Sequence, residues 1–172
     1  MLVMVTGGSG SGKSEYAEQV VTKLYKEQGK GRLIYLATMK PYGEETHKKI
    51  ERHRNMRKGK GFETVECFGG LKDIEWQKDD VILLECMSNL VADEMYDEQN
   101  KNLVEDIMEG ICRIVESDCQ MVVVTNEVFS DGLPYDKETL DYIKALADIN
   151  CRMAAMAEHV TEVVCGIPVC IK

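Results

Sequence analysis

The sequence predicts an α/β protein whose mostly parallel sheet is covered by helices on both faces. Strand-like and helix-like segments alternate along the chain, which is typical of β-α-β units joined by right-handed crossovers. Residues 81–84 and 121–125 are continuous apolar runs, as expected for strands buried on both faces. A third observation is that the first apolar run leads directly into a glycine-rich loop, which predicts a ligand site at the carboxyl edge of the sheet.

That first segment has the features of a phosphate-binding loop. An apolar run at 2–6 is followed by G-x-x-x-x-G-K-S and then by an amphipathic helical pattern. Glycines allow backbone N–H groups to turn inward, and the helix directs its positive end to the same place. Lys13 can then reach the β- and γ-phosphates, and the Ser14 hydroxyl can ligate Mg²⁺. The expected nucleotide-binding loop consists of Gly7, Gly8, Ser9, Gly10, Ser11, Gly12, Lys13 and Ser14.

The remaining elements follow from apolar periodicity and from punctuation by turn residues. Ala17, Val21 and Leu24 lie on one face of the first helix, and Gly29 follows its end. Asp136 is a plausible N-cap for the last helix. The expected elements in order are a strand at 2–6, a helix at 13–27, a strand at 33–37, a helix at 44–57, a strand at 63–67, a strand at 81–84, a helix at 103–116, a strand at 121–125, a helix at 137–158, and closing strands at 160–164 and 169–171.

Composition limits the classes of function. A chain of 172 residues is expected to form one domain, and its net charge of −9 argues against general nucleic-acid binding. No stretch is long enough to span a membrane, and the N-terminal apolar run is too short for a signal peptide. The 7 cysteines are scattered and contain no C-x-x-C pair, which argues against a zinc site or a disulfide framework. A reducing cytoplasm therefore fits best.

Polar residues end two of the buried strands. Glu85 directly follows the run at 81–84, where a carboxylate can hold Mg²⁺ opposite Ser14. The alternative is a carboxylate that caps the next segment or pairs with a lysine. Residues 125–127, Thr-Asn-Glu, end another strand and could serve either substrate binding or the turn itself.

A basic segment at 46–60 stands out in an otherwise acidic chain. Its arginines could neutralise a triphosphate, although such runs usually form a solvated helix face. His53 lies between Arg52 and Arg54, and neighbouring cations favour the neutral, nucleophilic form of an imidazole. His47 is six positions earlier and is expected to point to a different side of the helix.

An ordered set of motifs then extends over nearly the whole chain. The set consists of V-T-G-G at 5–8, S-G-K-S at 11–14, A-E at 17–18, Y-L-A-T at 35–38, I-E-R-H at 50–53, T-V-E at 64–66, I-L-L-E-C at 82–86, V-T-N-E-V at 124–128 and G-I-x-V-x-I-K at the end. On these motifs the chain resembles the bifunctional adenosylcobinamide kinase/adenosylcobinamide-phosphate guanylyltransferases of cobalamin biosynthesis. The chain departs from the family pattern at Gly10, at Lys58 and in the glycine spacing of 128–134, which leaves the histidine nucleophile intact.

The resemblance implies a particular chemistry. A histidine at the position of His53 attacks the α-phosphate of GTP, pyrophosphate leaves, and the GMP passes to adenosylcobinamide phosphate. The same family phosphorylates adenosylcobinamide with a nucleoside triphosphate, GTP or ATP. The resemblance further implies a RecA-like P-loop NTPase fold and a homo-oligomer, expected to be a trimer. It implies His53 and Lys13 as catalytic residues, with nucleotide contacts at Ala37, Thr38, Met39, Arg54, Asn55, Met56, Arg57, Glu66 and Glu85.

We therefore expect residues 1–172 to form a single P-loop catalytic domain. Its expected substrates are GTP or ATP and adenosylcobinamide or its phosphate, and Ser14 and Glu85 are expected to hold Mg²⁺. Two other functions remain open. One is a small-molecule kinase that forms no covalent intermediate, for which His53 is dispensable. The other is a GTP-dependent regulatory binding protein, although the chain has no N-K-x-D guanine motif.

Overall fold

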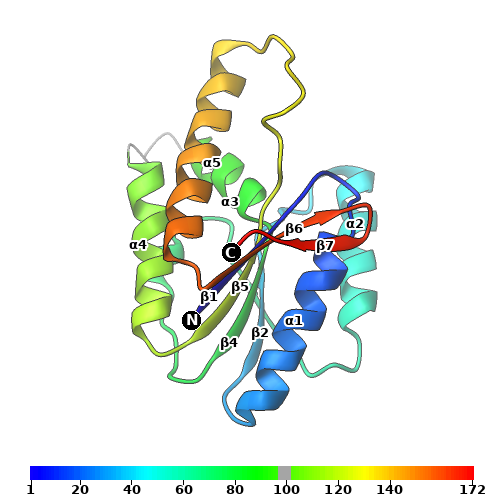
Figure 1. Ribbon diagram of the computed structural model, residues 1–172, viewed down its shortest axis with the longest axis vertical. Coiled ribbons are helices and arrows are strands. Elements are labelled where there is room, and N and C mark those ends of the chain that lie inside the picture. Colours follow the sequence, from blue (N-terminus) through cyan, green and yellow to red (C-terminus); the bar gives the residue numbers. More distant parts are fainter. Residues whose placement is uncertain (97–101) are drawn as a thin grey trace.

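The computed structural model describes residues 1–96 and 102–172, which form a seven-stranded sheet flanked by helices (Figure 1). The strands are β1 (Leu2–Thr6), β2 (Leu33–Ala37), β3 (Glu63–Glu66), β4 (Val81–Glu85), β5 (Gln120–Val124), β6 (His159–Val164) and β7 (Ile167–Cys170). The helices are α1 (Lys13–Gln28), α2 (Gly43–Arg57), α3 (Met87–Met95), α4 (Leu103–Glu116) and α5 (Lys137–Met156), with a short 3₁₀ helix, η1 (Leu71–Asp73), before β4.

The order of the strands places the glycine-rich loop near the middle of the sheet. The order is β3-β2-β4-β5-β1-β6-β7, and every pairing is parallel except the β6–β7 hairpin. The prediction of a mostly parallel sheet is therefore confirmed. β5 lies between β1 and β4 and is parallel to both, so the loop after β1 and the carboxyl end of β4 lie on the same edge of the sheet.

Alternate residues of each central strand face two different cores, which explains the continuous apolar runs. In β4, Ile82 and Leu84 pack in the core beneath α3, α4 and α5, whereas Val81 and Leu83 pack against α1. All four side chains are buried. Figure 1 shows these two groups of helices on opposite faces of the sheet, so the predicted three-layer arrangement is confirmed.

The predicted helix ends are largely those observed. The backbone N–H of Gly29, in the left-handed conformation, donates to the Tyr25 carbonyl and ends α1. The Asp136 carboxylate accepts from the Thr139 N–H at 2.8 Å and caps α5. The predicted end of α5 at 158 is two residues too late, and α3 was not predicted at all.

The β6–β7 hairpin supports the glycine-rich loop from the side. The Gly166 N–H donates to the Ser11 carbonyl at 2.8 Å. Gly7 has a φ of 149°, and a Cβ there would lie 2.5 Å from the Val163 carbonyl oxygen. Only glycine therefore allows the loop to pass this close to β6.

No helix in the described part of the chain combines the length and the apolar character that a membrane crossing requires.

A close contact in α4 gives a prediction about stability. A Cβ at Gly110 would lie 2.7 Å from Leu71 Cγ and 2.9 Å from the Lys72 backbone nitrogen. Gly110→Ala should therefore lower the free energy of unfolding by about 1–3 kcal/mol, because the overlap outweighs the higher helix propensity of alanine. Urea unfolding measures this, with Glu109→Ala on the exposed side of the same helix as a control that should change by less than about 0.5 kcal/mol. A more stable Gly110→Ala variant would contradict the packing described.

Candidate active site

The glycine-rich loop and α2 enclose a groove, the loop groove. It is lined by Ser9, Gly10, Ser11, Gly12, Lys13, Ser14, Glu15, Lys49, Arg52, His53 and Met56. Gly12 is the N-cap of α1, with a φ of 94° and no side-chain hydrogen bond to the first turn of the helix. The N–H groups of that turn therefore face a groove that also contains cationic side chains. This combination is suited to binding phosphate groups.

Lys13 lies folded against its own loop. Its Nζ donates to the Gly8 carbonyl at 2.8 Å, and the residue is only 8% exposed. Burial lowers the pKa of the Lys13 ammonium, while the nearby Cys86 and Glu85 act in the opposite direction. An anion in the groove would provide the charged partner that favours this desolvated cation.

A second hollow, the side cavity, lies between β2, α2 and the end of β3. It is lined by Tyr35, Ala37, Met39, Pro41, His47, Ile50, His53, Arg54, Arg57, Thr64, Glu66 and Phe68. Its volume is about 200 Å³. Sites for complete drug-sized ligands usually measure about 300–1,000 Å³. The side cavity is therefore of a size to take part of a ligand, with apolar walls and a few polar groups.

His53 is the residue that lines both hollows. It lies near the end of α2, and its side chain is 18% exposed. The Nδ1 atom lies 3.3 Å from Oε2 of Glu85, at the carboxyl end of β4. The imidazole therefore stands between the loop groove and the side cavity, with one ring nitrogen directed at a carboxylate.

Glu85 connects the loop to this histidine. Its side chain is 8% exposed, and its Oε2 lies 3.3 Å from Nδ1 of His53. Burial acts to raise the pKa of the Glu85 carboxyl. The interactions with His53 and Ser14 and the charge of Arg57 outweigh this and hold the pKa of the carboxyl below its usual value. The sequence indicated the cations that flank His53 along the chain, and the structure adds a carboxylate beside it.

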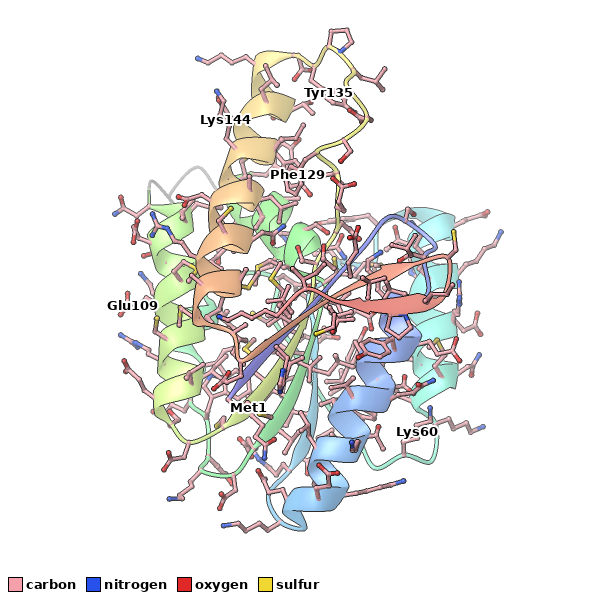
Figure 2. All side chains as sticks on the ribbon, viewed as in Figure 1. Met1, Lys60, Glu109, Phe129, Tyr135 and Lys144 are labelled. Carbon is pink, nitrogen blue, oxygen red and sulfur yellow. The ribbon has the colours of Figure 1, made fainter. Side chains whose placement is uncertain are left out.

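Two contacts fix the C-terminal end of α2. The Arg57 guanidinium stacks on the Tyr35 ring, 3.2 Å from its centroid. Lys60, labelled in Figure 2, follows α2 and forms an ion pair with the buried Glu18 of α1. Burial raises the pKa of the Tyr35 hydroxyl, an effect that Glu85 reinforces and Arg57 opposes. These contacts join the end of α2 and the loop after it to β2 and α1.

The structure brings most of the predicted site residues into the two hollows. The loop groove contains the loop residues from Ser9 to Ser14 and Met56, while Gly7 and Gly8 form the start of the loop. The side cavity contains Ala37, Met39, Arg54, Arg57 and Glu66.

Two predicted nucleotide contacts lie elsewhere. Thr38 is fully buried, and its hydroxyl donates to the Cys86 carbonyl at 2.8 Å and accepts from the Cys86 N–H at 2.6 Å. Asn55 is exposed on α2 and lines neither hollow, although Arg52 and Met56 beside it line the loop groove. Thr38 therefore supports the strand end beneath the site, and Asn55 lies next to the loop groove without lining it.

Sequence reasoning also misplaced one residue and missed others. His47 was expected to point away from His53, but both line the side cavity. The spacing of 47, 50, 54 and 57 is that of one helical face, a signal that was available in the sequence. Tyr35, Thr64 and Phe68 belong to other elements, and their place in the cavity depends on how α2 packs.

Ser14 and Glu85 together could hold a magnesium ion. Both present oxygen atoms, and Ser14 is close enough to Glu85 to help lower the pKa of its carboxyl. The residues described contain no cluster of three or more histidine, cysteine or acidic ligands. Mg²⁺ bound with a nucleotide needs only one or two protein oxygens, because phosphates and water complete its shell, so these two residues fit the ion.

The fold and the site define a P-loop nucleotide-binding enzyme. Two solved structures share the fold. The flagellar accessory protein FlaH from Methanocaldococcus jannaschii has a TM-score of 0.53 at 12% identity, covering 99% of this chain and 77% of that one. The second structure is the ATPase domain of another protein, which has a TM-score of 0.50 at 7% identity, covering 94% of this chain and 68% of that one.

Sequence comparison defines the family. The family model for cobinamide kinase / cobinamide phosphate guanyltransferase matches residues 3–171, so the chain belongs to this family of bifunctional kinases and guanylyltransferases. The bifunctional adenosylcobalamin biosynthesis protein CobU of Salmonella typhimurium is 29% identical over 188 residues, covering 100% of both chains.

Proposed function

We propose that the enzyme phosphorylates adenosylcobinamide and then transfers GMP from GTP to adenosylcobinamide phosphate, with His53 as the carrier of the GMP. The observation that carries this proposal is that His53 lies on the wall shared by the loop groove and the side cavity. A nucleotide with its terminal phosphates in the groove and its base in the cavity has its α-phosphate next to this imidazole. Covalent transfer through a histidine divides the reaction into two displacements at phosphorus.

The groove supplies the charge neutralisation that phosphoryl transfer needs. Lys13 and the first N–H groups of α1 bind the β- and γ-phosphates, and Lys49 and Arg52 lie across the groove. Ser14 and Glu85 would hold Mg²⁺, which would supply charge neutralisation on the phosphates. The same phosphate contacts serve a GTP or ATP molecule whose γ-phosphate is transferred to the hydroxyl of adenosylcobinamide.

The side cavity binds the base. Glu66 and Thr64 project from the same face of β3 into the cavity, whereas Glu63 does not line it. A carboxylate accepts two N–H groups from the edge of guanine, and adenine offers no matching pair. This arrangement explains a preference for GTP in the transferase reaction.

Glu66→Gln should therefore weaken GTP binding by about 1.5–3 kcal/mol and leave ATP binding nearly unchanged, because an amide can accept only one of the two bonds. Calorimetric titration with each nucleotide measures this. Glu63→Gln makes the same change on the other face of the strand and should bind both nucleotides normally. Equal losses for GTP and ATP in Glu66→Gln would remove base recognition from this residue.

The remaining expectations belong to the same proposal. We expect a single catalytic domain over 1–172 that assembles as a homo-oligomer, a trimer by family resemblance, measurable by sedimentation. The 7 cysteines are free thiols, which supports a location in the reducing cytoplasm.

The activity itself is tested with the substrates. Purified enzyme is incubated with ATP and adenosylcobinamide, then with GTP, and the corrinoid products are separated and identified by mass spectrometry. The proposal expects the phosphate first and the GMP conjugate second, with one pyrophosphate released per GMP. A phosphorylated corrinoid that never receives GMP would indicate a kinase alone, and hydrolysis of GTP to GDP with neither product would indicate a regulatory GTP-binding protein.

A further inference from the structure

The Glu85 carboxylate lies beside Nδ1, one of the two ring nitrogens of His53. Oε2 of Glu85 lies 3.3 Å from Nδ1 of His53, and both side chains are largely buried. An ionised carboxylate can only accept hydrogen bonds, so the ring nitrogen beside it must carry the hydrogen. A neutral imidazole with its hydrogen on Nδ1 has its lone pair on Nε2.

The helix that carries His53 is held in a way that preserves this contact. Arg57 lies one turn after His53 and is buried against the Tyr35 ring. The loop beyond α2 is tied to α1 by the ion pair of Lys60 with Glu18. The two anchors restrict rotation of the end of α2, so the imidazole keeps one ring edge toward β4 and the other toward the hollows.

We propose that Glu85 is a positioning residue that fixes the hydrogen of His53 on Nδ1 and thereby makes Nε2 the nucleophile. This inference rests on the proposed function. The Nε2 lone pair forms a bond to the α-phosphorus of GTP as the bond from that phosphorus to the bridging oxygen breaks, and pyrophosphate leaves with the bonding electrons. The Nδ1 hydrogen stays in place, hydrogen-bonded to Glu85.

The same contact acts on the covalent intermediate and on its discharge. An imidazole bonded to phosphorus at Nε2 and to hydrogen at Nδ1 carries positive charge in the ring, and the Glu85 carboxylate lies beside it to balance that charge. A phosphate oxygen of the acceptor then attacks the phosphorus, the N–P bond breaks, and its electron pair returns to Nε2. The imidazole regains its starting form with no net gain or loss of a proton.

The position of the hydrogen is measured by nuclear magnetic resonance on protein labelled with ¹⁵N in its 3 histidines. His47→Ala and His159→Ala assign the signals by elimination. In free protein without metal or nucleotide, at a pH where the ring is neutral, the inference expects the hydrogen of His53 on Nδ1. After reaction with GTP it expects phosphorus coupling to Nε2. Hydrogen on Nε2 in the free protein, or phosphorus on Nδ1 in the adduct, would overturn it.

Variants separate this role from a purely structural one. Glu85→Gln replaces the carboxylate by an amide that can donate as well as accept, so His53 should become a mixture of both tautomers. The variant should form the adduct more slowly, by a factor of at most about 100. Glu85→Asp, which keeps an acceptor, should recover part of the rate. Asp80→Asn removes another buried carboxylate beside β4, one that accepts from Arg32, and should leave the tautomer unchanged.

The outcomes distinguish the inference from the proposed function. If wild-type protein forms no adduct, the proposed function fails, while the tautomer in free protein still tests the contact. If Glu85→Gln keeps a single Nδ1–H tautomer, Glu85 does not position His53, whatever happens to the rate. A metal-binding role of Glu85 cannot produce the change in tautomer, because that measurement is made without metal.

Discussion

Replacement of His53 by alanine is expected to abolish formation of the GMP adduct completely. Alanine has no lone pair to attack phosphorus, and no other histidine lines both hollows in the part of the chain described. Intact-protein mass spectrometry after incubation with GTP should show one added GMP on the wild type and none on His53→Ala. Phosphorylation of adenosylcobinamide should persist in the variant, because Lys13 and the loop are unchanged.

His47→Ala is the matched control. His47 lies on the same helix and lines the same side cavity, but it is absent from the loop groove. This variant should still form the adduct. A label on His53→Ala, or an adduct that survives acid and not base, would show that a residue other than histidine carries the GMP.

Lys13→Ala is expected to remove tight binding of nucleoside triphosphates while leaving the fold intact. The ammonium group donates to the Gly8 carbonyl of its own loop, so its loss should disturb the loop rather than the sheet. It removes charge-assisted contacts to the β- and γ-phosphates, each worth about 1.5–3 kcal/mol, or roughly a tenfold to hundredfold loss of affinity per contact.

Calorimetry with GTP and ATP measures this affinity, and circular dichroism checks the fold. Lys23→Ala provides a control, since Lys23 lies on the exposed side of the same helix and forms only a solvent-exposed ion pair with Glu27. Unchanged affinity in a folded Lys13→Ala protein would contradict the assignment of the loop groove to triphosphate.

The sheet could be predicted from the sequence because its signal is local. Strands such as β4 and β5 are buried on both faces, so they read as short apolar runs bounded by polar residues. The helix α3 has only nine residues, follows β4 with only Cys86 between them, and begins without a side-chain cap. It therefore lacked both the length and the start signal on which the prediction of helices depended.

The site was only partly predictable, because its central contact joins segments that are distant in the sequence. The strand end at 81–84 predicted Glu85 as a metal ligand, and the family resemblance implied His53 as a nucleophile. Nothing in their spacing indicates that the two side chains lie beside each other. That contact depends on which face of α2 packs on the sheet, where Arg57 stacks on the ring of Tyr35. The resemblance implied a nucleotide contact at Thr38, but nothing in the sequence indicated that the Thr38 hydroxyl is hydrogen-bonded to the backbone of Cys86.

The central claim is that His53 carries GMP between donor and acceptor, and a chase experiment tests it most directly. Enzyme is incubated with GTP labelled at the α-phosphate, separated from free nucleotide, and then mixed with adenosylcobinamide phosphate. The account predicts one label per His53 before the chase, and complete transfer of that label to the corrinoid afterwards, without further GTP. Label that stays on the protein, or product that forms only when GTP and acceptor are present together, would contradict it.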